Sequence, residues 1–257
     1  MTPEPGADAH LDALRLSTRR LRDIATRLSE TGLTRRAYPA EWSVAQVLSH
    51  MGSAAVIMQR RLEDALAGAN TPDDFAPSIW DVWNAKTPVQ QRDDGLAADE
   101  ALLARIEAMT PEERDRFALS MGPLTLGFTD FVAMRLNEHA LHTWDIDVAL
   151  DPAATLPPQV SELIVDNLEL IARYTAKPTG DATTISVATV DPKRAFRVDL
   201  TADSVRFSPE TTAASADVEL PAEAFVRLVY GRLDPDHIPD GFETTALGTL
   251  RRVFPGP

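Results

Sequence analysis

Residues 135–145 read Arg-Leu-Asn-Glu-His-Ala-Leu-His-Thr-Trp-Asp, and the interpretation of the whole chain starts from them. They lie in an apolar-periodic run, residues 124–150, that contains no proline, so the pattern predicts a helix. Glu138 and His142 are four residues apart, which places a carboxylate and an imidazole side by side on one helix face. Helical bundles supply two metal ligands from one helix in this way and take the others from a second helix. The alternative is a solvent-facing hydrogen-bonded pair.

The composition narrows the class of protein. The chain has 257 residues, enough for one large domain or two modest ones, and a formal net charge of −14. Such a surface repels phosphate backbones and anionic lipids, so neither nucleic acid nor a membrane surface is an expected partner. No apolar run approaches the roughly 20 residues of a membrane span. The first ten residues do not resemble a secretory signal, and we therefore expect a cytoplasmic protein.

The chain contains no cysteine. This excludes disulfides, thiolate metal sites and a cysteine nucleophile. Any thiol chemistry at this protein must use a sulfur carried by a small molecule.

Three more helices are predicted before the one that contains residues 135–145. Leucine and isoleucine recur at helical spacing over residues 11–28. A second helix should begin at Ser43, because Gln46 three residues later completes a capping box, and it carries His50 about two turns in. A third is expected over residues 97–109. Together the four helices predict an antiparallel four-helix bundle in residues 1–150.

Residues 70–95 are predicted to form a long irregular connection. They contain three prolines, several aspartates and two tryptophans, Trp80 and Trp83. A loop of this length is uncommon in a compact domain unless it covers a site. The two tryptophans could either belong to a lid or fill the end of the bundle.

The pattern changes after residue 150, where residues 151–158 have the composition of a linker. Residues 151–257 are predicted to form a small α+β domain. Its expected elements are a helix over residues 159–176, strands over 184–190, 196–200, 205–207 and 217–220, a helix from 221 to about 230, and a short helix over 247–253. This half contains no repeat and no glycine-rich phosphate loop, so its sequence alone indicates no chemistry.

The histidines provide a possible metal site. His50 on one helix, with Glu138 and His142 on another, would give two imidazoles and one carboxylate with a fourth position open to water, as in catalytic zinc sites. The same donors also suit Fe(II), Ni(II) or Mn(II). His139 could replace Glu138 as a ligand, although it points about 100° away on the helix. His10 and His237 are interpreted as surface residues.

Two groups of residues resemble one protein family. They are Trp42-Ser43-x-x-Gln46-Val47-x-x-His50 and Arg135-x-x-Glu138-x-x-x-His142-x-Trp144-Asp145, and they look like the mycothiol-dependent maleylpyruvate isomerase family of actinobacteria, within the DinB-like metal-binding bundles. The resemblance continues into the C-terminal half through Val229-Tyr230-Gly231-Arg232-Leu233 and Leu250-Arg251-Arg252-Val253-Phe254-Pro255-Gly256, which look like a sterol-carrier-type domain. Nearly the whole chain is covered.

The resemblance implies a divalent metal, most simply Zn²⁺, held by His50, Glu138 and His142, with the thiol of mycothiol at the open position. A metal lowers the pKa of a coordinated thiol, so that it is a nucleophile at neutral pH. The thiolate could add to an electrophilic alkene and leave after bond rotation, which is cis–trans isomerisation. It could also stay attached or displace a leaving group, which is S-transfer.

Three further residues are candidates for the site. Arg135 is two turns before His142 and could hold Glu138 or a substrate carboxylate, or could instead be a helix-packing arginine. Asp145 could orient a ligating imidazole. Arg61, eleven residues after His50, could reach the mouth of a pocket that binds the cofactor.

We therefore expect a metal- and mycothiol-dependent S-transferase or isomerase that acts on a small electrophile. The alternative is a non-catalytic carrier with a vestigial metal site, whose C-terminal domain would hold a hydrophobic ligand in an apolar tunnel. The sequence does not identify the electrophile or the oligomeric state.

Overall fold

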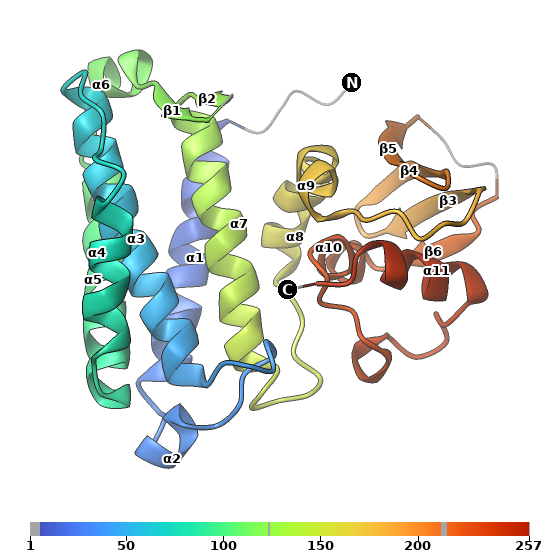
Figure 1. Cartoon of the computed structure of the whole chain (residues 1–257), viewed down its shortest axis with the longest axis horizontal. Coiled ribbons are helices and arrows are strands. Elements are labelled where there is room, and N and C mark those ends of the chain that lie inside the picture. Colours follow the sequence, from blue (N-terminus) through green and yellow to red (C-terminus); the bar gives the residue numbers. More distant parts are fainter. Residues whose placement is uncertain (1–5, 123, 212–214, 257) are drawn as a thin grey trace. The chain divides into compact units, whose positions relative to one another are not determined.

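The computed structural model describes residues 6–122, 124–211 and 215–256 (Figure 1). The chain divides after Asp151 into two compact units. The mixture of a helical N-terminal unit and a small α+β C-terminal unit confirms the predicted fold class. None of the described helices combines the length and the apolar character needed to cross a membrane.

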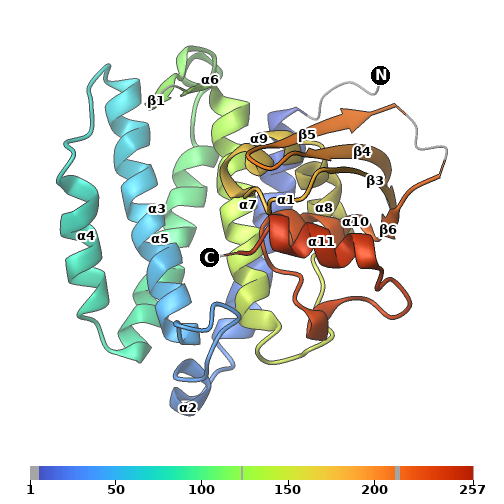
Figure 2. The same cartoon turned by 45° about the vertical axis from the view of Figure 1, so that its right-hand side comes forward.

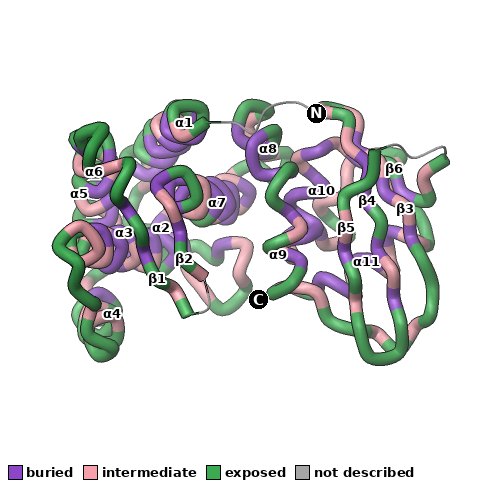
Figure 3. Tube along the Cα trace, turned by 90° about the horizontal axis from the view of Figure 1, so that it is seen from above, coloured by how far each residue is buried: buried purple, intermediate pink, exposed green. Residues whose placement is uncertain are grey.

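The N-terminal unit is built around four long helices. Its elements in chain order are α1 (Ala7–Ala25), α2 (Glu30–Leu33), α3 (Val44–Leu66), α4 (Phe75–Asn84), α5 (Pro88–Glu107), α6 (Pro111–Arg116), the hairpin β1 (Leu119–Met121) and β2 (Leu124–Leu126), and α7 (Phe128–Asp147). Helices α1, α3, α5 and α7 turn their buried residues toward one another (Figure 3).

The directions of the four helices differ from the predicted antiparallel bundle, because two neighbouring pairs, α3 with α5 and α1 with α7, run parallel. Helices α3 and α7 are antiparallel, as are α1 and α5, but α3 and α5 run in the same direction (Figure 2). Two contacts between α3 and α5 establish their parallel direction. Gly52 lies against Gly95, and Glu63 accepts a hydrogen bond from Arg105 at 2.6 Å, so residue numbers increase in the same direction along both helices. The reason is α4, which carries the chain back along α3 before α5 begins.

The start of α3 follows the predicted capping box. The Gln46 backbone N–H donates to the Ser43 hydroxyl at 3.2 Å, and the Ser43 N–H donates to the Gln46 side-chain oxygen at 2.8 Å. This cap satisfies two backbone donors that a helix start would otherwise leave unpaired. It fixes the first turn of α3, and therefore the position of His50 within the helix.

The prediction of an irregular segment at residues 70–95 is wrong. Helix α4 and the first two turns of α5 together fill most of it, because α5 begins at Pro88, well before residue 97. The prolines were interpreted as helix breakers, but proline is also favoured in the first turn of a helix. Pro88 is the first residue of α5 and directly follows the N-cap Thr87, which forms a capping box with Gln90. Trp83 is buried against Gly52, whereas Trp80 is 48% exposed, so Trp83 fills the packing and does not belong to a lid.

Glycines set the separation of α3 and α5. A Cβ atom on Gly52 would lie 2.6 Å from the Cα of Gly95 and would overlap the ring of Trp83. A Cβ atom on Gly95 would lie 2.8 Å from the carbonyl oxygen of Leu48. Only residues without a side chain permit this approach, so both positions require glycine for packing.

A buried polar network joins α1, α5 and α7. Asp99 of α5 accepts hydrogen bonds from Arg135 at 2.5 Å and from His139 at 2.8 Å, and the other ring nitrogen of His139 lies 2.8 Å from the hydroxyl of Ser17 on α1. All four residues are at most 3% exposed. Burial alone raises the pKa of the Asp99 carboxyl, but the charges and hydrogen bonds of His139 and Arg135 outweigh it and hold that pKa well below its usual range.

The C-terminal unit is a four-stranded sheet with helices. Its elements are α8 (Pro158–Val165), α9 (Leu168–Thr175), β3 (Thr183–Val190), β4 (Lys193–Leu200), β5 (Val205–Glu210), β6 (Val218–Leu220), α10 (Ala222–Val229), the 3-10 turn η1 (Pro235–His237) and α11 (Thr245–Val253). The strand order is β5-β4-β3-β6, with β3 parallel to β6 and the other pairs antiparallel. The rings of Phe196, Phe207 and Phe225 join the sheet to α10.

The helix predicted over residues 159–176 is divided into α8 and α9 at Asp166 and Asn167. Asp and Asn favour turn conformations over helix interiors because their short side chains bond to nearby groups. Here Asn167 donates to the carbonyl of Leu163, and Asp166 accepts two hydrogen bonds from Arg194 on β4. The break therefore lets the helical segment bond to the sheet.

We predict that Asp99→Asn strongly destabilises the N-terminal unit. The substitution leaves the buried guanidinium of Arg135 without a counter-charge, which costs about 3–5 kcal/mol in comparable buried pairs. Urea unfolding at neutral pH measures this loss. Asp93→Asn is the matched control on the same helix, because its ion pair with Arg92 is exposed and such pairs contribute at most about 1 kcal/mol. Equal effects of the two substitutions would contradict the prediction.

Candidate metal centre

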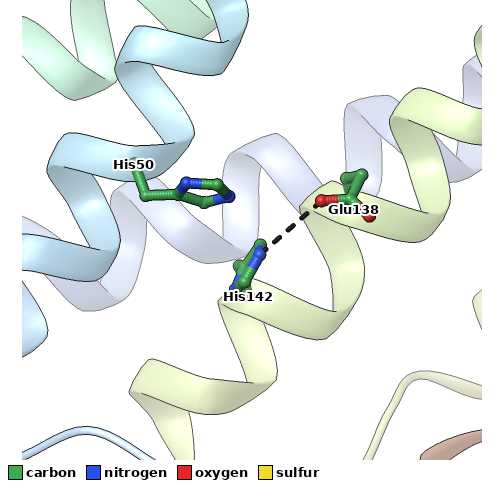
Figure 4. Close-up of side chains that lie close together, drawn as sticks. All are labelled: His50, Glu138 and His142. Carbon is green, nitrogen blue, oxygen red and sulfur yellow. Dashed lines mark ion pairs between the residues drawn. The ribbon is translucent and has the colours of Figure 1, made fainter. Parts of the chain in front are cut away.

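The structure brings His50, Glu138 and His142 together between α3 and α7. One ligand atom from each residue lies within 4.8 Å of the others, and the three side chains point toward a common space (Figure 4). The two imidazole rings are 4.7 Å apart between centroids, and His142 Nε2 lies 3.6 Å from the Glu138 carboxylate.

A divalent cation fits these donors. Imidazole and carboxylate donors bind zinc at about 2.0–2.2 Å, so two ligand atoms on one ion are roughly 3–4 Å apart. The observed spacing needs only small side-chain movements to reach that value. The side chain of Glu138 is 50% exposed while that of His142 is 13% exposed, so the space between them opens to solvent on the glutamate side. A further ligand could enter from that side.

His50 is held in its neutral form. Burial and the neighbouring His142 lower the pKa of His50 to about 4, against a smaller opposing effect of Glu138. The ring of Trp42, from the loop that leads into α3, lies 5.2 Å from the His50 ring and limits its rotation. A neutral imidazole has the free lone pair that metal binding requires.

Asp145 orients His142. Its carboxylate accepts a hydrogen bond from His142 Nδ1 at 2.9 Å, which leaves Nε2 facing Glu138. Asp145 is fully buried, and its backbone carbonyl accepts a hydrogen bond from the N–H of Tyr38, so its position is fixed by the surrounding chain. A carboxylate behind a histidine is the usual means of setting the ring orientation at a metal.

The side chains of Arg135 and His139 bond to Asp99 and are not part of the cluster of three candidate ligands. Their side chains form the buried network with Asp99, so His139 does not replace Glu138 in the cluster. The buried ion pair also agrees with the helix-packing alternative for Arg135. Both residues position α7, since they anchor one face of the helix while Glu138 and His142 occupy the adjacent face.

The remaining candidates are dispersed. Arg61 lines a separate cavity near the end of α3. His10 is 3% exposed, so its interpretation as a surface residue is wrong; it lies among the buried residues of α1, which also include Leu11 and Leu14. His237 is partly buried and bonded to Asp234.

Sequence reasoning did not identify Asp99 and gave Trp42 no role in the site. Asp99 lies in a helix whose charged residues are mostly exposed, and nothing in its spacing distinguishes it from Asp93 or Asp94. Trp42 lies one residue before the N-cap Ser43, where a hydrophobic residue often packs against the first turn of the helix. This position was the signal that could have indicated a role for Trp42 beside His50.

The fold and the site define a DinB-like helical bundle joined to an α+β unit. Residues 14–147 match the family model described as "Mycothiol maleylpyruvate isomerase N-terminal domain". This match covers more than half of the chain, and the chain belongs to that family. The resemblance inferred from the two motifs is thereby confirmed.

Two solved structures resemble the whole chain. One is the mycothiol-dependent maleylpyruvate isomerase, at 13% identity, and the other is a histidine-to-alanine mutant of a protein with that name, at 12% identity. Each alignment covers 94% of this chain and 96% of the other, with a TM-score of 0.67. At this identity the likeness establishes a shared fold. No curated protein matches the chain.

We predict that His50 makes the stability of the metal-free protein depend on pH between about 4 and 6.5. In this window the unfolded chain binds a proton at His50 and the folded chain does not, so stability falls as the pH is lowered. Urea unfolding across this range should show a steeper fall for the wild type than for His50→Gln, which has no titrating group there. Parallel profiles would contradict the prediction.

We also predict that Asp145→Asn weakens metal binding about 10- to 100-fold without unfolding the protein, because the ring of His142 loses its fixed orientation. Competition with a chromophoric chelator measures the affinity, and circular dichroism checks the fold. Asp147→Asn is the control two residues away, since Asp147 pairs with Arg20 and not with the site. Unchanged metal affinity in Asp145→Asn would contradict the assigned role.

Proposed function

We propose that the protein is a metal- and mycothiol-dependent enzyme in which the thiolate of mycothiol attacks an electrophilic small molecule. The observation that carries the proposal is the convergence of His50, Glu138 and His142 in a chain without cysteine. Membership of the mycothiol maleylpyruvate isomerase family supports the choice of thiol. The proposal places the enzyme in the cytoplasm, and the net charge of −14 argues against nucleic acid as a partner.

The three side chains have separate tasks in this proposal. His50 and His142 supply neutral nitrogen donors, and Glu138 supplies the negative charge that partly neutralises a divalent cation. Two nitrogens and one oxygen suit Zn²⁺, which we propose as the resident ion. The bound ion would lower the pKa of a coordinated thiol so that it is deprotonated at neutral pH.

The reaction class is nucleophilic attack by sulfur on carbon. If the sulfur adds to a conjugated alkene, the former double bond can rotate, and departure of the sulfur regenerates the alkene as its geometric isomer. If the sulfur displaces a leaving group or the adduct is released, the product is an S-conjugate. The solvent opening beside Glu138 gives an electrophile access to the site in either case.

The carrier alternative finds less support. It requires an apolar tunnel in the C-terminal unit. A cavity of about 430 Å³ in that unit has a mixed lining, which consists of Leu156, three prolines, Thr155, Ser161 and the acidic residues Glu162, Asp191 and Glu223. A lining with three acidic residues is not the continuous apolar tunnel that the carrier alternative requires.

We predict that His50→Ala and His142→Ala each lose bound metal and mycothiol-dependent turnover together. Loss of a ligand should lower metal affinity by more than the roughly 10- to 100-fold effect of losing a residue that only orients one. Elemental analysis of the purified protein and a screen of thiol-dependent turnover on electrophilic alkenes and halides measure the two properties. His237→Ala, in the other unit, is the control and should retain both. Full turnover in a metal-free variant would overturn the proposal.

A further inference from the structure

A cavity of about 920 Å³ in the N-terminal unit is lined by α3, the connection from α3 to α4, and strand β1. Figure 2 shows β1 at the same end of the unit as the C-terminal end of α3. Two unbroken stretches of chain, residues 68–73 and 118–122, provide most of the lining, and Arg61 adds a guanidinium from α3. The cavity shares no residue with the candidate metal centre, so its ligand has to be inferred from its own lining.

The wall formed by residues 118–122 is the free edge of a strand. Side chains alternate between the two faces of a strand, so a cavity on one face is lined by alternate residues. Five consecutive residues line this cavity, which indicates the backbone edge instead. Strand β1 pairs with β2 along its other edge, and among the described residues it pairs with no further strand. The edge that faces the cavity is therefore open.

Ser120 directs its backbone groups to this open edge. Only two residues separate β1 from β2 in the sequence, so Met121 and Leu124 form the hydrogen-bonded pair that closes the hairpin. The next pair, Ser120 with Thr125, is a non-hydrogen-bonded pair, because the two kinds alternate along an antiparallel ladder. The N–H and C=O of Ser120 therefore point away from β2, and those of Thr125 point away from β1.

Two charged side chains of the lining have no partner. In the part of the chain that the structure describes, neither Arg61 nor Asp73 forms a side-chain hydrogen bond or an ion pair. The neighbouring Arg60 differs, because it donates to Asp64 at 2.8 Å. Thr71 also donates to Asp64, at 2.7 Å, which ties the connection to α3. An anchored segment thus places one available cation and one available anion in the same cavity as the open strand edge.

We propose that this cavity binds a short zwitterionic peptide, of which a tripeptide is the best fit. The middle residue of the peptide adds to the hairpin as a third strand and exchanges two hydrogen bonds with Ser120. The C-terminal carboxylate of the peptide binds Arg61, and its N-terminal ammonium group binds Asp73. Three extended residues span about 10 Å, which matches the three-residue length of β1.

The test of the two charged contacts compares tri-alanine with its C-terminal amide and its N-acetyl form, none of which has a charged side chain. Titration calorimetry of the full chain should show that amidation weakens binding about tenfold, the effect of losing a hydrogen bond to a charged group. In Arg61→Ala, tri-alanine should lose the same affinity, and amidation should have no further effect. Acetylation should relate to Asp73→Asn in the same way. Arg27→Ala, which removes an exposed arginine outside the cavity, is the control for net charge.

The strand edge is tested by removing one N–H. Ser120→Pro deletes the N–H that points to the cavity and spares the ladder with β2, and proline is accepted at such edge positions. We expect tri-alanine affinity to fall about two- to tenfold, the range for one neutral hydrogen bond. Thr125→Pro is the matched control, because the N–H that it removes points to the opposite edge. Circular dichroism checks the fold of both variants. N-methylation of the middle residue of tri-alanine removes the corresponding donor from the ligand, and should cause a similar loss with the wild-type protein.

Four results would overturn the inference. Tri-alanine could fail to bind the wild type at millimolar concentration. Equal affinity for tri-alanine and both blocked forms would show that the termini are not recognised, and would assign the edge to a segment within a longer chain. Equal losses in Ser120→Pro and Thr125→Pro, with no effect of N-methylation, would exclude the strand edge. Loss of binding after removal of metal would place the peptide at the metal centre. The inference does not depend on the proposed function, because none of these measurements involves a thiol or turnover.

Discussion

The buried carboxylate of Asp99 is the constraint on which the N-terminal unit depends. A carboxylate at this depth is stable only when its charge is matched, and the matching groups, Arg135 and His139, both belong to α7. These two residues are four apart and therefore share one face of the helix. Once that face is bound to α5 and α1, the rotation of α7 is fixed, and the adjacent face with Glu138 and His142 must look toward His50.

The same four-residue spacing thus occurs twice on α7 with different outcomes. Glu138 and His142 stay accessible and converge with a ligand from another helix, whereas Arg135 and His139 are enclosed by packing. The absence of cysteine gives the first pair its significance, because a sulfur nucleophile at this site can only be a bound small molecule. In this view the protein contributes a cation site and its orientation, and the cosubstrate contributes the reactive atom.

Much of this arrangement could be predicted from the sequence, and the failures have physical causes. The helix around residues 135–145 and the capped start of α3 follow from local rules. The four-residue spacing paired Glu138 with His142, and the placement of His50 on another predicted helix, together with the resemblance to the family, added it to the group. The partner of Arg135 could not be predicted, because a contact between α5 and α7 depends on helix packing and not on local spacing. The segment before α5 was predicted as irregular because proline disrupts the interior of a helix but is favoured in its first turn, and the sequence alone did not distinguish the two cases. The parallel course of α3 and α5 was likewise hidden, since it results from the unrecognised α4.

The glycine contact behind the metal centre has a further consequence for the choice of ion. Gly52 follows His50 by two residues and therefore projects from nearly the opposite side of α3, where it rests on Gly95. The distance between the axes of α3 and α5 therefore sets the distance from His50 to α7. That distance in turn sets the radius of the cation that the three donors can bind without strain. The selectivity of the site among metals of similar affinity can therefore depend on Gly52 and Gly95, which contact neither the ion nor its ligands.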